Sequence, residues 1–303
     1  MQEFLKGRLK LEEKKELRRL IKQSLDEDIG GGDVTTGCLF GRDFSVEAAL
    51  IAKEDCLLCG IGVFREVFLC LSSECDFRFR YGDGDYLSGN TEVGRVVCGV
   101  KTMMKAERTA LNFLQHLSGV ATLTRAFVEK AGGLNIYDTR KTKPMLRNLE
   151  KYAVRIGGGR NHRFGLFDMV MIKDNHIFAF MKKNGITDRA EAVYRSVRKA
   201  RESSAGRYKV EVEVENAVEA LRAFEAGADI IMFDNADIAE LEKFREAVGE
   251  GRKGLEIEWS GNVNFGNIGS LKGLRADRVS VGAITHSARA VDFSLKIRGA
   301  ECT

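Results

Sequence analysis

Lysine and carboxylate side chains follow short apolar runs in the second half of the chain, in a pattern that could act on a phosphate-bearing substrate. Lys141 and Lys173 each follow such a run, and Glu213 and Asp234 each close another. If the runs are parallel strands, the polar residues at their carboxyl ends gather on one rim. Two carboxylates with no His or Cys nearby suit Mg²⁺, which bridges protein carboxylates to substrate phosphates. We therefore expect a Mg²⁺ site at this rim.

Three glutamates occupy alternate positions around one of these carboxylates. Glu211, Glu213 and Glu215 face the same side of their strand, because side chains alternate with a period of two. At most two of them can serve the site, and we expect the others to be paired or solvated. Asp234 lies 21 residues after Glu213, one helix further on, so we expect the two carboxylates on neighbouring strand ends.

The positive charge of the chain is concentrated in residues 138–176. This stretch holds nine Lys or Arg and four Asp or Glu, a net charge of +5, whereas the whole chain carries +4. Local positive charge of this kind marks a place where anions bind. Arg140, and His162 with Arg163 on a loop after a glycine run, supply it beside the rim. Because arginine binds a carboxylate through two parallel hydrogen bonds, we expect a ligand with several carboxylates.

Serine and glycine residues follow the last two apolar runs. Ser260, Gly261 and Gly282 offer backbone N–H groups that can approach a phosphate closely. A magnesium site, a phosphate cradle and a polycarboxylate pocket would then share one rim. This combination favours phosphoryl-sugar chemistry on an acidic co-substrate.

Strand-like runs and helical segments alternate from residue 135 onward, which predicts a parallel sheet that is closed or nearly closed into a barrel. The expected strands are 135–139, 168–172, 209–214, 229–233, 255–259 and 278–281. Before this region, residues 9–25 have the pattern of an amphipathic helix, and 44–100 that of short strands around a helix at 62–70. This predicts a small α+β domain.

Two helices are expected between these regions and a third inside the basic stretch. The first helix spans 101–117 and is expected to break at Ser118-Gly119, and the second runs to Lys130. Pro144 should start the third helix, with Thr142 as its cap, and that helix should end at residue 156. Its basic residues recur at every fourth position, so we expect them to form a solvated face. They are Arg147, Lys151 and Arg155.

The amino-acid composition limits the classes of protein to which the chain can belong. The chain has 303 residues, 44% of them hydrophobic and 30% charged, which is globular composition. We expect no signal peptide, no membrane span and a cytoplasmic location with reduced thiols. Cys56 and Cys59 have the gap of a metal or redox pair, but without a second pair we expect buried thiols. The glycines at 30–32 lack the context of a phosphate loop, so we expect a turn.

The chain resembles the quinolinate phosphoribosyltransferase family, also called nicotinate-nucleotide pyrophosphorylase (carboxylating), from about residue 20 to 297. The motifs that carry the resemblance are LDEDIGGGDVTT at 25–36, ERTALN at 107–112, DTRKT at 138–142, GGGRNHR at 157–163, IKDNH at 172–176, EVEVEN at 211–216, FDN at 233–235, SGN at 260–262 and SVGA at 280–283. Each motif is weak alone, and their shared order is specific. Met145, Trp259 and Phe167 depart from the family pattern, and Trp259 could narrow the phosphate cradle.

The resemblance implies a fold of the α/β class: an incomplete, seven-stranded α/β barrel with an N-terminal α/β sandwich domain. The sandwich would span residues 1–117 and the barrel 118–287, with 288–303 packing back on the sandwich. The implied reaction joins quinolinate to phosphoribosyl pyrophosphate, with Mg²⁺. It gives nicotinate mononucleotide, pyrophosphate and CO₂ in NAD biosynthesis, and nucleic acid has no part in it.

The resemblance also implies roles for individual residues. Arg140, His162 and Arg163 match ligands of the quinolinate carboxylates, and Thr139 lies with them in the substrate site. The catalytic set comprises Lys141 and Lys173, which match lysines between the two substrates, and Glu213 and Asp234, which match acids near the ribose and the metal.

The remaining matches concern the phosphate and a neighbouring chain. Ser260, Gly261 and Gly282 match the phosphate cradle. Pattern alone makes Arg108 a solvated helix charge, but the resemblance implies that it completes the site of a neighbouring subunit. A homodimer would follow, with assembly beyond the dimer left open.

Two other functions stay open on the sequence. One is a phosphoribosyltransferase of the molybdenum-transport-associated or nicotinate-using type, which would release no CO₂. The other is a non-catalytic binder of anions or nucleic acid that uses the basic stretch. The second alternative would leave Glu213 and Asp234 without a role.

Overall fold

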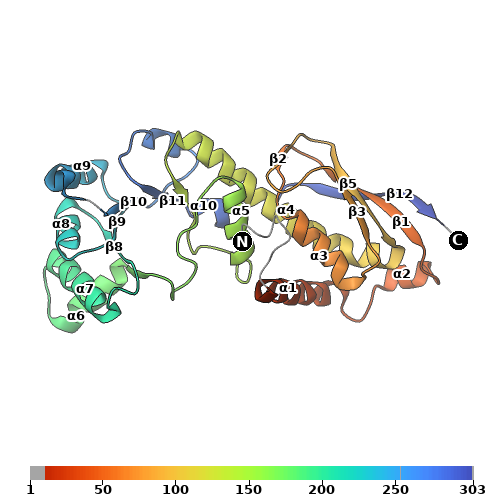
Figure 1. Ribbon diagram of the computed structural model, residues 1–303, viewed down its shortest axis with the longest axis horizontal. Coiled ribbons are helices and arrows are strands. Elements are labelled where there is room, and N and C mark those ends of the chain that lie inside the picture. Colours follow the sequence, from red (N-terminus) through yellow and green to blue (C-terminus); the bar gives the residue numbers. More distant parts are fainter. Residues whose placement is uncertain (1–10, 253, 302–303) are drawn as a thin grey trace. The chain divides into compact units, whose positions relative to one another are not determined.

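The computed structural model describes residues 11–252 and 254–301 and divides into two compact units. Unit 1 comprises residues 1–126, 143–158 and 287–303, and unit 2 comprises 127–142 and 159–286, so far as these are described. Unit 1 contains an antiparallel sheet and unit 2 a parallel sheet with helices (Figure 1). This confirms the expected α/β class. The expected boundary at 117/118 falls inside a helix, α4, that runs from Val100 to Ala131.

Unit 1 is built on a four-stranded antiparallel sheet in the order β12-β1-β5-β3. Its strands are β1 (Ser45–Ala52), β3 (Asp76–Phe79), β5 (Thr91–Gly99) and β12 (Phe293–Glu301), and a separate pair joins β2 (Cys56–Leu57) to β4 (Tyr86–Leu87). The last strand of the chain, β12, pairs with β1 along its whole length. The sheet therefore joins the first strand of the described chain to the last.

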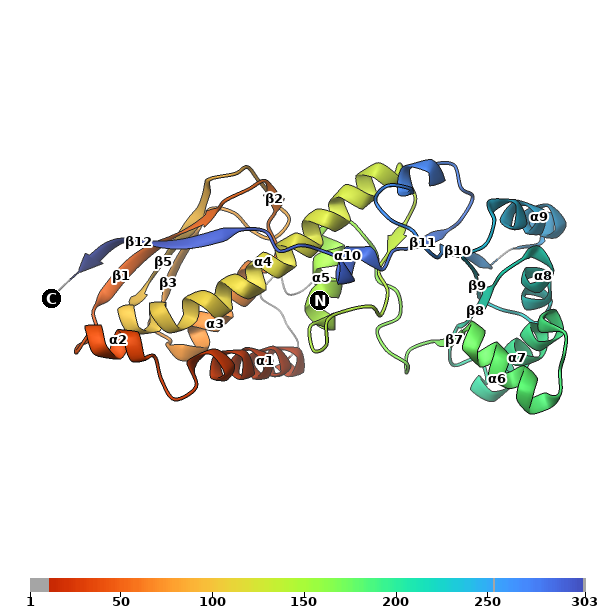
Figure 2. The same ribbon diagram turned by 180° about the vertical axis from the view of Figure 1, so that it is seen from behind.

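Helices α3 (Ile61–Leu71) and α4 lie along one face of this sheet (Figure 2). The other helices of unit 1 are α1 (Leu11–Ile29), which packs against α3, α2 (Val34–Leu39) and α5 (Arg147–Ile156). The α3 rings of Phe64 and Phe68 meet Phe79 and Phe77 of β3 at centroid distances of 6.1 and 6.0 Å. Burial of such aromatic side chains supplies much of the energy of a core. The expected turn after α1 is confirmed, since Gly30 and Gly32 there have positive φ.

The predicted break of the long helix at Ser118-Gly119 is wrong, because both residues serve close packing inside α4. The Ser118 hydroxyl accepts a hydrogen bond from Cys59 N–H at 3.0 Å and donates to Cys59 O at 3.1 Å. A Cβ on Gly119 would lie 2.0 Å from the carbonyl oxygen of Arg289. The small residues therefore let two other segments approach the helix. It ends at Ala131, one residue after the end expected at Lys130.

The helix in the basic stretch also differs from its prediction. It starts at Arg147, not at Pro144, because Met145 has a φ of +66°, which a right-handed helix cannot include. It ends at Ile156, as expected. Its basic face is not solvated: Lys151 is buried, and Arg147 and Arg155 are half-buried.

Unit 2 is built on a six-stranded parallel sheet in the order β6-β11-β10-β9-β8-β7. The strands are β6 (Ile136–Tyr137), β7 (Val170–Ile172), β8 (Val210–Val214), β9 (Ile230–Asp234), β10 (Glu256–Ser260) and β11 (Arg278–Ser280). A single parallel bridge between Arg160 and Tyr137 adds a seventh position at the β6 edge. Among the described residues no pairing joins that edge to β7, so the sheet stays open. All six expected strands are present.

Helices and two 3₁₀ turns connect these strands. They are α6 (Asp174–Asn184), α7 (Arg189–Ser204), α8 (Ala217–Glu225), α9 (Ile238–Val248), η1 (Gly249–Arg252), η2 (Ile268–Leu271) and α10 (Ala283–His286). Figure 1 shows α6 to α9 on one side of the strands. Val210, Val212 and Val214 of β8 are buried and alternate with the glutamates, which point to the other face. That other face carries the polar residues.

No helix in the described ranges combines the length and the apolar character that a bilayer crossing requires.

Candidate active site

A pocket of about 370 Å³ lies at the carboxyl ends of the unit 2 strands. Its lining residues are Thr139, Arg140, Lys141, His162, Arg163, Met171, Lys173, Glu213, Met232, Asp234, Ser260 and Ser280. Nine of these twelve residues were expected in the site from the sequence. The pocket does not include the expected residues Gly261, Gly282 and Arg108 in its lining. The strand-end pattern therefore brings most of the candidate residues together.

Lys173 and Glu213 form an ion pair across neighbouring strands. The ammonium of Lys173 donates to Glu213 Oε1, and the backbone N–H of Asp174 donates to Oε2 at 3.1 Å. Lys173 precedes α6, where its own N–H donates to Nδ1 of His176 at 2.9 Å. These contacts fix the lysine at the carboxyl end of β7 with its charge at the pocket.

The loop after β6 holds Arg140 and Lys141. Lys141 N–H donates to the hydroxyl of Thr139 at 3.0 Å, and the Thr285 hydroxyl donates to the Lys141 carbonyl at 2.7 Å. A Cβ on Gly282 would lie 3.0 Å from the Lys141 side chain. Gly282 thus shapes the rim by making room for Lys141, although it does not line the pocket itself.

Asp234 and Ser260 lie opposite each other in register at the ends of β9 and β10. The next residue on each strand takes a left-handed turn: φ is +52° at Asn235 and +95° at Gly261. A Cβ on Gly261 would lie 2.4 Å from Asn235 N. Glycine is therefore required at 261, where it holds the β9 and β10 ends close together.

Two guanidinium groups supply unused donors on the cationic side of the pocket. Arg163 Nη1 donates to the carbonyl of Met169 at 3.1 Å. The Nε atoms of Arg140 and Arg163 are buried, and neither has a hydrogen-bond partner within the described chain. Burial lowers the pKa of Arg163, as does the charge of Arg140. Buried cationic donors without acceptors are costly, so an anionic ligand would stabilise this arrangement.

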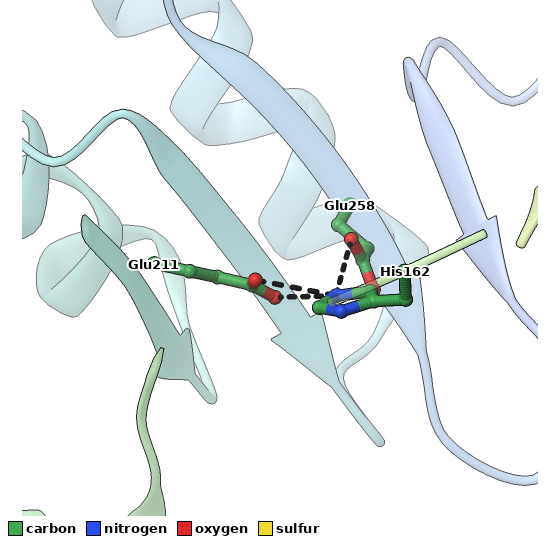
Figure 3. Close-up of side chains that lie close together, drawn as sticks. All are labelled: His162, Glu211 and Glu258. Carbon is green, nitrogen blue, oxygen red and sulfur yellow. Dashed lines mark hydrogen bonds and ion pairs between the residues drawn. The ribbon is translucent and has the colours of Figure 1, made fainter. Parts of the chain in front are cut away.

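His162 lies in a buried cluster with two glutamates (Figure 3). Its Nε2 is 3.2 Å from Oε2 of Glu211 and 3.4 Å from Oε2 of Glu258. Burial lowers the pKa of His162, but hydrogen bonds to both carboxylates outweigh this effect and raise it, which favours a hydrogen on Nε2. Its Nδ1 accepts the N–H of Arg163 at 2.7 Å. His162 was expected to bind the substrate, but both of its ring nitrogens therefore make contacts within the protein.

Sequence reasoning missed Glu258, Ser280, Met171 and Met232. The missed signal is the period of two along each strand, which places Glu258 on the inward face two residues before Ser260. The same period puts Ser280 two residues before Gly282. At most two of the three alternating glutamates were expected to serve the site, with the others paired or solvated. Exposed Glu215 is paired in this way, with Arg189 at 3.1 Å.

Arg108 lies on α4 in unit 1, where its side chain is exposed. The structure contains one chain, so the role expected for Arg108 in a neighbouring site stays a prediction.

The chain matches two family descriptions that together cover most of its length. Residues 33–118 match the N-terminal domain of quinolinate phosphoribosyl transferase, and residues 120–296 match its C-terminal domain. The two matched ranges correspond to the antiparallel-sheet unit and the parallel α/β unit of the structure.

Relatives and solved structures agree with this match. A probable nicotinate-nucleotide pyrophosphorylase [carboxylating] of Bacillus subtilis is 36% identical, with 93% of each chain covered. Its counterpart in Methanocaldococcus jannaschii is 38% identical, covering 92% of this chain and 96% of the relative. The crystal structure of NadC from Streptococcus pyogenes superposes with a TM-score of 0.85 at 38% identity, over 94% of this chain and 96% of that one. The chain belongs to the quinolinate phosphoribosyltransferase family.

Proposed function

We propose that the chain transfers the phosphoribosyl group of phosphoribosyl pyrophosphate to quinolinate with loss of CO₂, giving nicotinate mononucleotide and pyrophosphate for NAD biosynthesis. Family membership gives the reaction class, that of a pentosyltransferase. The observation that carries the assignment is the pair of buried, unpartnered Nε donors of Arg140 and Arg163 in the strand-end pocket. Quinolinate has two adjacent carboxylates, which these donors can satisfy.

The lining residues of the pocket suit the two substrates. Arg140, Arg163 and Thr139 would bind quinolinate, and Ser260 and Asp234, at the ends of β10 and β9, would meet the phosphoribosyl group. Ser260, Gly261 and Gly282 would receive the phosphate through backbone N–H groups. Lys141 follows β6 and Lys173 follows β7, and both line the same pocket, where their charges would attract both anions.

The donor set fits Mg²⁺. Glu213 and Asp234 both line the pocket, and only oxygen ligands are offered there by the two residues. Glu213 already accepts from Lys173 and Asp174, whereas half-buried Asp234 accepts the amide of exposed Asn235 at 3.1 Å. Asp234 is therefore the better direct or water-mediated ligand, with Glu213 beside it. When bound, Mg²⁺ would neutralise the pyrophosphate charge.

The residues then act by charge rather than by covalent chemistry. As the ribose–pyrophosphate bond breaks, Lys141 and Lys173 stabilise the negative leaving group, and Glu213 and Asp234 stabilise the positive sugar. The quinolinate nitrogen attacks the sugar carbon. Loss of CO₂ then leaves an electron pair on the ring carbon beside the positive ring nitrogen, and that carbon takes up a proton from water to give nicotinate mononucleotide. Arg140 and Arg163 hold the remaining carboxylate in place during this step.

The proposal extends to assembly and location. A homodimer would let exposed Arg108 reach the pocket of the neighbouring subunit, and assembly beyond the dimer stays open. The cysteines of the described ranges are free thiols, which is consistent with a cytoplasmic location.

A direct assay tests the function. Purified protein is supplied with quinolinate, phosphoribosyl pyrophosphate and Mg²⁺, and nicotinate mononucleotide and CO₂ are measured. We expect one CO₂ for each nucleotide formed and no product when EDTA removes the metal. Turnover of nicotinate without CO₂ release, at a rate equal to or above that with quinolinate, would contradict the proposal.

A further inference from the structure

Two members of the buried cluster, Glu211 and Glu258, have no role in the reaction as proposed above, and the third, His162, lines the pocket. All three side chains are buried, and they come from the loop at 161–163, β8 and β10 (Figure 3). Glu211 lies two residues before Glu213 on β8, and Glu258 lies two residues before Ser260 on β10. Because side chains on a strand alternate, the two glutamates form the layer directly beneath the pocket.

The hydrogen bonds of His162 define its tautomer. Nδ1 accepts the N–H of Arg163 at 2.7 Å, so Nδ1 keeps a free lone pair for that bond. Nε2 then carries the ring hydrogen and donates toward the two carboxylates, at 3.2 Å to Glu211 and 3.4 Å to Glu258. The imidazole is therefore a bridge from the carboxylate pair to the backbone at Arg163.

The same cluster could be read as a metal site, since the three groups offer ligand atoms within 4.8 Å of one another. A metal on Nε2 would require the hydrogen to lie on Nδ1 instead. The Arg163 N–H already points at Nδ1, so that tautomer would set two hydrogens against each other. The geometry favours a hydrogen-bonded bridge over a metal centre.

Three contacts join the cluster to the pocket wall. The Ser280 hydroxyl, which lines the pocket, donates to Oε1 of Glu258. The backbone of His162 donates to Oδ1 of buried Asp138 at 2.8 Å, which anchors the same loop from its other side. The third contact is the bond from Arg163 N–H to the imidazole. Both Ser280 and Arg163 thus take their positions from one buried group of side chains.

We propose that Glu211 and Glu258 are positioning residues for the pyridine dicarboxylate: through His162 and Ser280 they set where Arg163 and the adjoining pocket wall meet the substrate carboxylates. This inference rests on the proposed function, because it assigns the cationic side of the pocket to quinolinate. Neither glutamate lines the pocket, so both act through other residues. Their loss affects the affinity for quinolinate more than that for phosphoribosyl pyrophosphate.

The two glutamates permit a conservative rescue. At 258, a glutamine oxygen can still accept from Ser280, and its NH₂ group can donate to the Glu211 carboxylate nearby. An alanine removes the acceptor of Ser280 and one acceptor of His162. Glu258→Gln therefore keeps the acceptor of Ser280 and loses only the longer of the two contacts of His162, at 3.4 Å, whereas Glu258→Ala loses both.

The experiment measures steady-state kinetics for both substrates in Glu258→Ala, Glu258→Gln and Glu211→Ala, with thermal melting as a check of folding. We expect each alanine variant to raise KM for quinolinate roughly 10- to 100-fold, the range that a displaced binding group produces. KM for phosphoribosyl pyrophosphate should stay within about twofold, and Glu258→Gln should recover most of the quinolinate affinity. Glu256→Gln is the matched control, since Glu256 lies on the same strand and pairs with Lys209 at 2.8 Å.

Other outcomes would overturn the inference. Equal rises in both KM values, or equal effects of Gln and Ala at 258, would mean a general structural role. If an alanine variant fails to fold, the kinetics of folded Glu258→Gln and Glu211→Gln test the inference instead. A metal site would lose function in both glutamine variants, and that result would contradict the inference. A bound metal ion that is found at one per chain in the wild-type protein and lost in Glu258→Gln would also contradict it. Wild-type protein inactive on quinolinate would instead overturn the proposed function.

Discussion

The sheets of the two units differ in whether they bury charged side chains. In unit 1, the buried residues of β1 are Val46, Ala48, Ala49, Leu50, Ile51 and Ala52, all apolar. In unit 2, β8 and β10 bury apolar residues as well, but they also bury Glu211, Glu213 and Glu258. The first sheet is a conventional hydrophobic core, and the second has a charged interior.

The charged interior does not favour folding. Moving a carboxylate out of water is costly, and apolar residues of similar volume often stabilise a protein more than a buried ion pair does. The apolar sheet of unit 1 shows that the chain forms ordinary cores where nothing else is required. The acids of unit 2 are therefore best explained by the pocket above them, where they fix lysine, histidine and serine. Substitutions in unit 1 should change stability, and those at the unit 2 rim should change kinetics.

The largest kinetic effect is expected from Arg140→Ala. The substitution removes a buried guanidinium beside an acidic ligand group, so kcat/KM for quinolinate should fall by an amount equivalent to about 2–5 kcal/mol. Melting temperature should change little, because the Nε of Arg140 has no hydrogen-bond partner within the described chain. Arg198→Ala, at an exposed ion pair with Glu202, is the control. Near-normal turnover in Arg140→Ala would remove the basis for the assignment.

One chemical change, glycine to alanine, tests the contrast directly. Gly119→Ala in unit 1 would place a Cβ 2.0 Å from the Arg289 carbonyl, and Gly261→Ala in unit 2 would place one 2.4 Å from Asn235 N. Overpacking of this kind typically costs about 1–3 kcal/mol. We expect Gly119→Ala to lower the free energy of unfolding with unchanged KM values. Gly261→Ala should raise KM for phosphoribosyl pyrophosphate, because it displaces the phosphate cradle.

The control for this pair is Gly37→Ala in α2, where no atom lies within 4 Å of the added Cβ. It should leave both stability and kinetics nearly unchanged. Loss of stability in Gly261→Ala without any kinetic change would mean that Gly261 has only a structural role. That result would contradict the expectation that substitutions at the unit 2 rim change kinetics.

Strands were predictable from the sequence because their apolar runs and polar ends are local signals. All six strands of the parallel sheet lie where alternating β/α segments placed them, and their ends brought nine expected residues into one pocket. The helix break at Ser118-Gly119 was predicted wrongly because small residues carry two meanings. They can end a helix, or they can admit a neighbour such as the Arg289 carbonyl, and only tertiary contacts decide between these.

The same limit applies to the charged side chains. The sequence placed Lys151 on a solvated face, yet it is buried, because fourfold spacing of basic residues does not show what packs against them. Glu258 was missed because no local motif marks a carboxylate that acts through His162. Contacts between residues about 50 to 100 positions apart, such as that between His162 and Glu258 at 3.4 Å, require the fold itself.

Ser118→Ala should have a smaller effect that is confined to stability. The hydroxyl makes two hydrogen bonds to the Cys59 backbone, and alanine would leave that buried N–H without its partner. Loss of this kind costs about 1–3 kcal/mol. Urea unfolding should show the loss, while kcat and both KM values stay unchanged. A change in KM for either substrate would show that unit 1 packing affects the pocket.

The smallest effect is expected from thiol labelling, which reports on unit 1, since the cysteines that the structure describes all lie in that unit. Cys38 is exposed, whereas burial raises the pKa of Cys56 to about 11 and that of Cys98 to about 12. The thiolate is the reactive form, so a raised pKa slows alkylation at pH 7 and leaves Cys38 to react first among the described cysteines. Mass spectrometry after brief iodoacetamide treatment would give the order. Activity should survive labelling of Cys38, and early labelling of Cys56 or Cys98 would show that the apolar core of unit 1 opens readily.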